Sequence, residues 1–435
     1  MFSFLFLSSR NPFSTKSRAT RTRVHGSTTS IYYILTPGNL KGAQIMVVTI
    51  IADVLGEENN GTTIACMNLV RYCQSRGDTV KIVCADQDKK DVPGYYVVPL
   101  NKVLSWMAKR NKVTIAKVDR NVIERAIEGS DIVHCMIPFP LSRMAMKICR
   151  EKNIPITAGF HMQAENFSSH FGFLMNCGVF NYFVYQNCWN HFYKYVDAIH
   201  YPTEFIKKVF ESTIEERTNG YVISNGVNDR FFNKQIEKPE DLKDKFVILT
   251  TGRFSTEKAQ KVLIKAVKYS KYKDKIQLIL AGTGPLESKF KKMGKKYCIN
   301  QPMMKFFGRD EIVDVINYSD LYCHTAVAEL EGIACLESLK CGLVPVIANS
   351  NRCATKYFAK DENCLFKANN SKDLARRIDF WIEHPELKEE YKKYYIENSA
   401  IYDQTECMRE TRNMLLEAIR CRKNKKERSY ITAMN

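Results

Sequence analysis

The chain has 435 residues and a formal net charge of +18, and 45% of its residues are hydrophobic and 26% charged. This composition is that of an ordinary globular protein with two or three domains. No run reaches the ~18 uninterrupted apolar residues of a membrane helix, and the cysteines include no C-x-x-C pair, which argues against a zinc knuckle or a thioredoxin-like motif.

Residues 1–45 show no pattern of a packed core. Serine, threonine and arginine dominate much of this segment, and Asp and Glu are absent from residues 1–44. Met46 stands where the first predicted strand begins. We therefore expect a disordered extension over 1–45, and we hypothesise that the native chain starts at Met46 and that the preceding residues are upstream sequence read through. The DNA before codon 46 tests this hypothesis.

The residues after Met46 predict the start of a Rossmann-like domain that extends over 46–235. A strand over 46–52 is followed by a loop that contains Gly61, by an apolar-periodic helix and by a strand over 80–84. A glycine-containing first turn of this kind favours a nearby phosphate, so Gly61 is a candidate donor-binding residue. The loop is not G-x-G-x-x-G, which excludes a dinucleotide fingerprint. The pair Asp86-x-Asp88 only trails a strand, and we expect no metal site there.

A histidine follows a later strand of the same domain. The segment 154–160 reads as a strand and delivers His161 and Glu165 at its carboxyl end, where open α/β sheets bind ligands. These side chains are candidates for contact with sugar hydroxyls or for proton transfer. A lone histidine is more often structural, and His134, His200 and His324 read as strand or core histidines.

A second βαβ unit begins at Phe246, after a polar linker over 235–245. Strands over 246–250 and 276–281 flank a helical pattern, which predicts a parallel sheet and a second Rossmann-like domain over 236–404. Arg253 and Lys258 stand after the first of these strands, where two cations can neutralise a diphosphate. Taken alone, both would more often be surface charges.

The stretch between Ala328 and Pro345 places Glu329 and Glu337 on either side of a predicted helix start at Gly332-Ile333. A helix start offers unpaired N–H groups and partial positive charge, which suit a phosphate. The carboxylates can then meet hydroxyls on both sides of that phosphate, the layout of a nucleotide sugar. The alternative is a helix with two solvated acids.

These segments together resemble family 4 of the retaining glycosyltransferases. The resemblance rests on Gly252-Arg253-Phe254-Ser255-x-Glu257-Lys258, on Ala281-Gly282-x-Gly284-Pro285, on Phe307-Gly308-Arg309, on Glu329-x7-Glu337 and on Gly342-Leu343-Val344-Pro345, in this order. It covers roughly residues 46–420. One departure follows the first glutamate, where Leu330-Glu331-Gly332 replaces the common Gly-Phe-Gly and leaves the identity of the donor sugar open.

The resemblance implies a GT-B fold, in which two Rossmann-like domains face a central cleft. It also implies a C-terminal helix that returns to the first domain. We expect this helix over 405–425 and a tail over 426–435. It implies that Arg253 and Lys258 hold the donor diphosphate, that Glu337 binds ribose and that Glu329 and His161 contact the transferred sugar. Gly282, Gly284, Gly332 and Ile333 would complete the donor site. The implied reaction is a metal-independent hexosyl transfer of class 2.4.1, in which the acceptor approaches from the side of the leaving group and the diphosphate helps to remove its proton.

The acceptor and the cellular location are less directly indicated. Scattered cysteines suit a reducing cytoplasm, and the net charge, the aromatic tract over 180–195 and the basic Trp106 segment favour a peripheral position at an anionic membrane surface. We expect a UDP-sugar donor and a lipid acceptor such as diacylglycerol, and no nucleic acid partner. The alternatives are a soluble sugar or sugar-phosphate acceptor, and a non-catalytic subunit that binds nucleotide sugars.

Overall fold

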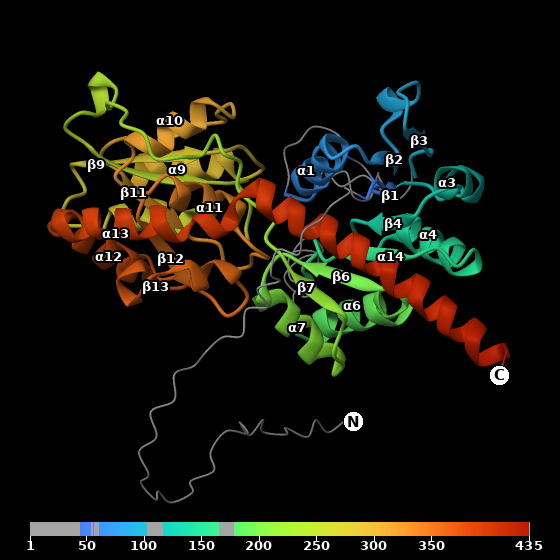
Figure 1. The fold of residues 1–435 in the computed structure, drawn as a ribbon. Helices are drawn as coiled ribbons and strands as arrows, with labels where there is room; N and C mark the ends of the chain where they lie inside the picture. The colour runs from blue at the N-terminus through green and yellow to red at the C-terminus, as the bar shows by residue number, and fades with distance from the viewer. Residues whose placement is uncertain (1–43, 54, 56–60, 102–115, 165–177, 435) are drawn as a thin grey trace, which may run out of the picture. The chain divides into compact units, whose positions relative to one another are not determined.

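A computed structural model describes residues 44–53, 55, 61–101, 116–164 and 178–434, with side chains up to residue 424. The Trp106 segment, Glu165 and almost all of the 1–45 extension lie outside the described residues. From Ile45 onward the chain forms one unit, which contains two parallel sheets (Figure 1). We call each sheet with its helices a lobe.

The first lobe is built on a parallel sheet with the strand order β3-β2-β1-β4-β5-β6-β7. Its strands are β1 (Val47–Ile51), β2 (Thr79–Cys84), β3 (Tyr95–Val97), β4 (Ile132–Cys135), β5 (Ile156–Gly159), β6 (Ala198–Tyr201) and β7 (Gly220–Val222). The helices are α1 (Gly61–Ser75), α3 (Arg120–Ile127), α4 (Pro140–Glu151), α6 (Gly178–His191) and α7 (Glu204–Ile214).

Strand residues of this sheet alternate between two hydrophobic clusters. Ile50 belongs to the cluster that includes residues of α1, whereas Ile51 belongs to the cluster formed with α3, α4, α6 and α7. Successive side chains of a strand point to opposite faces, so helices cover both faces of the sheet. This burial on both sides explains the continuous apolar runs that predicted the strands.

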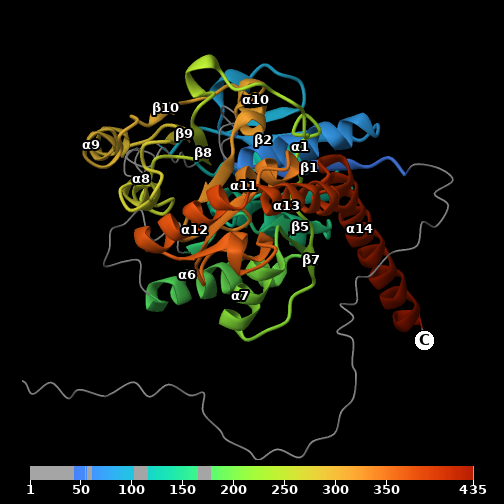
Figure 2. The same ribbon diagram turned by 90° about the vertical axis from the view of Figure 1, so that its left-hand side faces the viewer.

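The second lobe repeats this plan with the strand order β10-β9-β8-β11-β12-β13. All pairings are parallel. The strands are β8 (Phe246–Thr251), β9 (Ile276–Ala281), β10 (Met303–Lys305), β11 (Leu321–His324), β12 (Pro345–Asn349) and β13 (Leu365–Lys367). The helices are α8 (Lys261–Val267), α9 (Glu287–Tyr297), α10 (Glu311–Tyr318), α11 (Ile333–Lys340), α12 (Ser371–Glu383) and α13 (Pro385–Asn398), and α11 to α13 face the viewer in Figure 2.

The last helix, α14 (Gln404–Met434), packs on the first lobe. Met408, Met414 and Leu415 share a buried cluster with residues of α1 and β1. Arg412 forms a bidentate, buried ion pair with Asp78, the residue before β2, through bonds of 2.6 and 2.7 Å. The chain therefore returns to the lobe in which it began, and the helix is longer than the sequence predicted.

The last strand of the first lobe is short and is followed by a turn. β7 ends at Val222, and Ser224 and Asn225 then contact Glu331 of the second lobe. Gly226 has a φ of +76°, which a strand does not accommodate.

Candidate active site

The site is built around the start of α11, where the second lobe presents an N-terminal helix end. Gly332 caps α11 with a φ of +90°, and a Cβ there would lie 2.2 Å from Thr355 Cγ2. Only glycine combines this left-handed backbone with so close a neighbour. The helix begins at Ile333, in the segment after β11, and the first N–H groups of a helix suit an anion.

Glu329 and Lys258 meet beside this helix start. Lys258 donates a charge-assisted hydrogen bond to Glu329 Oε2, and both side chains are largely buried. Burial opposes the charged form of each group, but their attraction outweighs it, so the pKa of Lys258 is raised and the pKa of Glu329 is lowered. The pair therefore stays ionised at neutral pH.

His324 lies next to Glu329, and the sequence pattern predicted that it is a core histidine. It is a buried residue of β11, as predicted. Its Nε2 lies 3.7 Å from Glu329 Oε2 and has no hydrogen-bond partner in the described part of the chain. Its Nδ1 lies 3.3 Å from the hydroxyl of Tyr322. Burial lowers the pKa of His324 to about 4, against the pull of Glu329, so the imidazole is neutral.

Arg253 and the two predicted glycines lie in the loops after β8 and β9, which are adjacent strands. The Arg253 side chain is exposed, and within the described residues no ion pair holds it. A Cβ on Gly282 would lie 2.1 Å from Gly252 O, and one on Gly284 would lie 2.7 Å from Phe254 N. These glycines therefore let the two loops pack against each other and so support the backbone around Arg253.

Glu337 lies one turn inside α11 and is partly buried. Burial raises the pKa of its carboxyl to about 8, although Arg309 and Arg230 act in the opposite direction. Arg309 comes from the Phe307-Gly308-Arg309 motif, which the sequence associated with the family but to which it gave no role. The arrangement leaves Glu337 able to accept or donate a hydrogen bond to a sugar hydroxyl.

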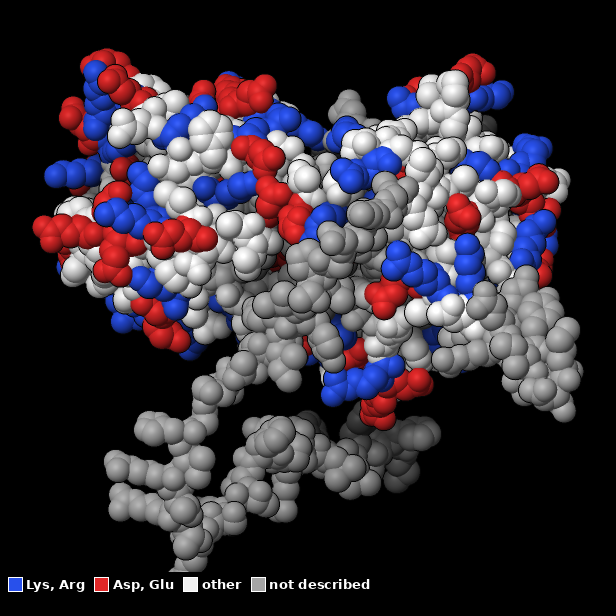
Figure 3. Space-filling model, viewed as in Figure 1, with Lys and Arg blue, Asp and Glu red and all other residues white. Residues whose placement is uncertain are grey.

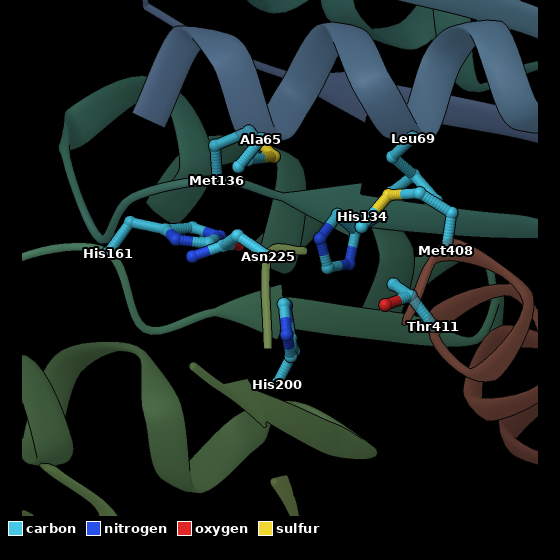
Figure 4. Close-up of a pocket in the computed structure, with 9 residues that line it drawn as sticks. All are labelled: Ala65, Leu69, His134, Met136, His161, His200, Asn225, Met408 and Thr411. Carbon is cyan, nitrogen blue, oxygen red and sulfur yellow. The ribbon is translucent and has the colours of Figure 1, made fainter. Parts of the chain in front are cut away.

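His161 follows β5 in the first lobe and lines a small cavity with His134 and His200 (Figure 4). Burial lowers the pKa of His161 well below its usual range, and the neighbouring His200 and His134 lower it further. His134 and His200 are buried strand residues, as the sequence predicted, with bonds to Thr157 Oγ1 and Ile223 O. Gly61 is the exposed first residue of α1, and residues 56–60 before it lie outside the described part.

Sequence reasoning missed the contacts that join the two lobes next to this site. Thr203 donates to Leu330 O at 2.8 Å, and Gln163 donates to Arg352 O at 2.9 Å. Glu331, the residue that departs from the family pattern, is buried and accepts hydrogen bonds from Ser224 and Asn225. The partners in each contact are more than 100 residues apart in sequence. The one sequence signal near these contacts was the departure from the family pattern at Glu331.

Two family models match the chain in succession. Residues 59–231 match the model described as Glycosyltransferase Family 4, and residues 231–398 match Glycosyl transferases group 1. The two matches cover both lobes. The chain belongs to the family 4 glycosyltransferases of the GT-B fold. This glycosyltransferase therefore has the fold that the sequence motifs predicted.

Three comparisons describe what this glycosyltransferase resembles. It is 27% identical over 237 residues to alpha-monoglucosyldiacylglycerol synthase of Streptococcus pneumoniae, across 51% of this chain and 52% of that protein, so it spans about half the length of that curated relative. It superimposes on HepE of Anabaena, solved with UDP-glucose, with a TM-score of 0.66 and 15% identity over 86% of this chain and 100% of that one. It is 44% identical to the catalytic domain of cholesterol-alpha-glucosyltransferase from Helicobacter pylori over 36% of this chain and 98% of that one, with a TM-score of 0.35.

Two searches of the described residues concern metals and membranes. No group of three or more His, Cys, Asp or Glu side chains is arranged there to hold a metal ion. Among the helices of this part of the chain, none is both long and apolar enough to cross a bilayer.

Proposed function

We propose that this glycosyltransferase moves a hexose from a UDP-sugar to a membrane lipid such as diacylglycerol, with retention of the anomeric configuration and without a metal ion. The observation that carries the proposal is the Lys258–Glu329 ion pair at the start of α11, with the exposed Arg253 on the neighbouring loop. Two cations and the helix N–H groups provide the charge that a diphosphate requires.

In the proposed reaction the bond between the sugar C1 and the diphosphate oxygen breaks, and the acceptor hydroxyl forms the new bond to C1 on the same face. The acceptor proton passes to the departing diphosphate. Arg253, Lys258 and the α11 N–H groups stabilise the charge that develops on this leaving group. As Lys258 turns to the diphosphate, Glu329 becomes free to accept a hydrogen bond from the sugar, while Glu337 binds ribose.

The choice of donor and acceptor has independent support. HepE, which shares the fold, was solved with UDP-glucose, and the curated relative is named as a synthase of a glucosyldiacylglycerol. At the start of α6, Val179 and Phe183 have exposed fractions of 68% and 63%, and Tyr182 is 47% exposed. Apolar and aromatic side chains displayed in this way suit the interfacial region of a bilayer.

The charge distribution on the visible face does not point to a membrane surface. Figure 3 shows Lys and Arg interspersed with Asp and Glu on the visible face rather than gathered in one basic patch. Residues 1–44 carry Lys or Arg at positions 10, 16, 18, 21, 23 and 41 without an acidic residue, so part of the +18 net charge lies outside the described residues.

A donor panel assayed with lipid vesicles tests the proposal. UDP-glucose, UDP-galactose and GDP-mannose are each incubated with diacylglycerol in anionic or neutral vesicles, and labelled glycolipid, UDP release and anomeric configuration are measured. We expect an α-linked glycolipid from a UDP-sugar, unaffected by EDTA and lost in Lys258→Ala. Lys261→Ala, which removes an exposed lysine of α8, is the matched control.

The other outcomes separate the alternatives. Transfer only to a soluble sugar or sugar phosphate would replace the lipid acceptor, and β-linked product would overturn retention. Tight UDP binding without transfer to any component of a membrane extract would favour a non-catalytic subunit.

A further inference from the structure

We propose that Glu331 and Asn225 form a positioning pair that joins the donor loop of the second lobe to the cavity around His161 in the first lobe. The pair fixes how Asn225 presents its amide to that cavity, and thereby orients His161 towards the donor sugar. This inference rests on the proposed function, which gives His161 and the donor loop a common substrate.

Glu331 provides the end of the pair in the donor loop. Its side chain is 3% exposed. Its Oε1 accepts hydrogen bonds from the Ser224 hydroxyl and, at 3.0 Å, from the Asn225 N–H, while its Oε2 accepts from Asn225 Nδ2 at 2.6 Å. All three partners donate to the carboxylate. Burial raises the pKa of Glu331 to about 7, and the hydrogen bonds from Ser224 and Asn225 act in the opposite direction, in favour of the ionised form. Glu331 lies directly between Leu330 and Gly332, the cap of α11, so a shift of Glu331 would move the proposed anion site.

Asn225 provides the end of the pair in the first lobe. Because its Nδ2 faces the carboxylate, its Oδ1 points the other way, and this buried oxygen has no hydrogen-bond partner among the residues that the structure describes. The side chain lines the cavity that also contains His161, His200 and Thr411 (Figure 4). A buried polar atom without a partner is costly and calls for an explanation.

His161 supplies a chemical reason for this acceptor. Burial and the neighbouring histidines keep His161 neutral, so one ring nitrogen carries a proton and the other does not. An amide oxygen in the shared cavity favours the tautomer and ring orientation that direct the N–H towards it through an ordered water. Glu331 thus acts on His161 through Asn225, and neither residue needs to touch the substrate.

Exchanging the donor and acceptor within the pair tests this idea. In Glu331→Gln, the new amide nitrogen faces Asn225 Nδ2, so Asn225 turns and presents its NH₂ to the cavity. In Asn225→Asp, two carboxylates face each other. The double variant Glu331→Gln with Asn225→Asp restores a donor opposite an acceptor and again presents an oxygen to the cavity. We expect each single change to lower kcat at least tenfold, and the double variant to return to within about threefold of the parent.

Two further measurements separate positioning from folding. All kcat values are expressed per molecule able to bind UDP, and Glu331→Gln is repeated in a His161→Ala background, where we expect no further loss because the pair acts through His161. Thr203→Val, which removes the neighbouring contact to Leu330 O, is the control. Its effect on kcat should be the same in the parent and in the His161→Ala background. A double variant no better than the worse single variant, or full additivity with His161→Ala, would overturn the proposal.

Nitrogen NMR of the histidine rings provides a readout that does not depend on turnover. We expect the tautomer signals of His161 to change in Glu331→Gln and to return in the double variant, while those of His324 stay constant. If the parent protein fails to transfer any sugar, the proposed function is wrong but the NMR result still decides on the pair. Unchanged His161 signals in an active enzyme would refute the pair alone.

Discussion

The ammonium of Lys258 is bound to the carboxylate of Glu329, although the two residues are 71 positions apart in the chain. They meet because they follow β8 and β11, which are neighbours in the sheet. A diphosphate that binds Lys258 must therefore compete with Glu329 for the same cation.

This competition predicts opposite effects of two substitutions on UDP affinity. Lys258→Ala should raise the Kd for UDP about 10- to 100-fold, since a charge-assisted hydrogen bond contributes about 1.5–3 kcal/mol. Glu329→Gln should leave UDP binding unchanged or tighter, because Lys258 is released, yet should reduce transfer strongly. Calorimetry with UDP and an assay with UDP-sugar measure these effects. Equal weakening of UDP binding by both substitutions would contradict the competition.

The position of His161 depends on the absence of a side chain at Gly159. A Cβ on Gly159 would lie 2.4 Å from His161 Nε2. Gly159→Ala should therefore rotate the imidazole away and lower kcat about tenfold or more, while the protein remains folded and binds UDP normally. Gly178→Ala is a suitable control, because a Cβ at Gly178 would meet no atom of the described residues within 4 Å. An unchanged kcat in Gly159→Ala would show that the position of this ring does not matter for transfer.

The buried pair of Arg412 and Asp78 should contribute to stability mainly through the penalty for separating the partners. Arg412→Ala leaves the Asp78 carboxylate buried beside the Met46 N–H and without its guanidinium, which we expect to lower the free energy of unfolding by about 3–5 kcal/mol. Arg409→Ala on the same helix breaks a solvent-exposed pair with Glu406 and should cost at most about 1 kcal/mol. Urea unfolding of both variants measures the difference. Similar losses would argue against the buried pair as the anchor of α14.

Glu337 should make stability depend on pH in a defined direction. Its pKa is raised from 4.5 to about 8 by burial, so the folded state holds the proton more tightly than the unfolded chain. The associated stability is complete below about pH 4.5 and is lost as the pH rises through about 8. Relative to Glu337→Gln, the parent should lose about 2 kcal/mol or more between pH 4.5 and 8.5, measured by urea unfolding at several pH values. A difference that stays constant or grows with pH would contradict this assignment.

From the amino-acid sequence alone, the fold could be predicted and candidate residues for a site on the second lobe could be proposed. Apolar runs followed by glycine predicted the parallel strands, because strands buried on both faces have no polar side to interrupt the pattern. Arg253, Lys258, Glu329 and Glu337 could be proposed because each stands close to the end of a strand or the start of a helix. In a parallel sheet these ends meet at one edge.

The contacts that connect the candidate site to the first lobe became visible only in the folded structure. Glu331 appeared in the sequence as an unexplained departure, and its partners at Ser224 and Asn225 could not be foreseen because they belong to the other lobe. The same holds for His324, whose proximity to Glu329 depends on the path of the loop between them. Local periodicity records which face of a strand or helix is buried, whereas a hydrogen bond between distant residues depends on the packing of whole lobes.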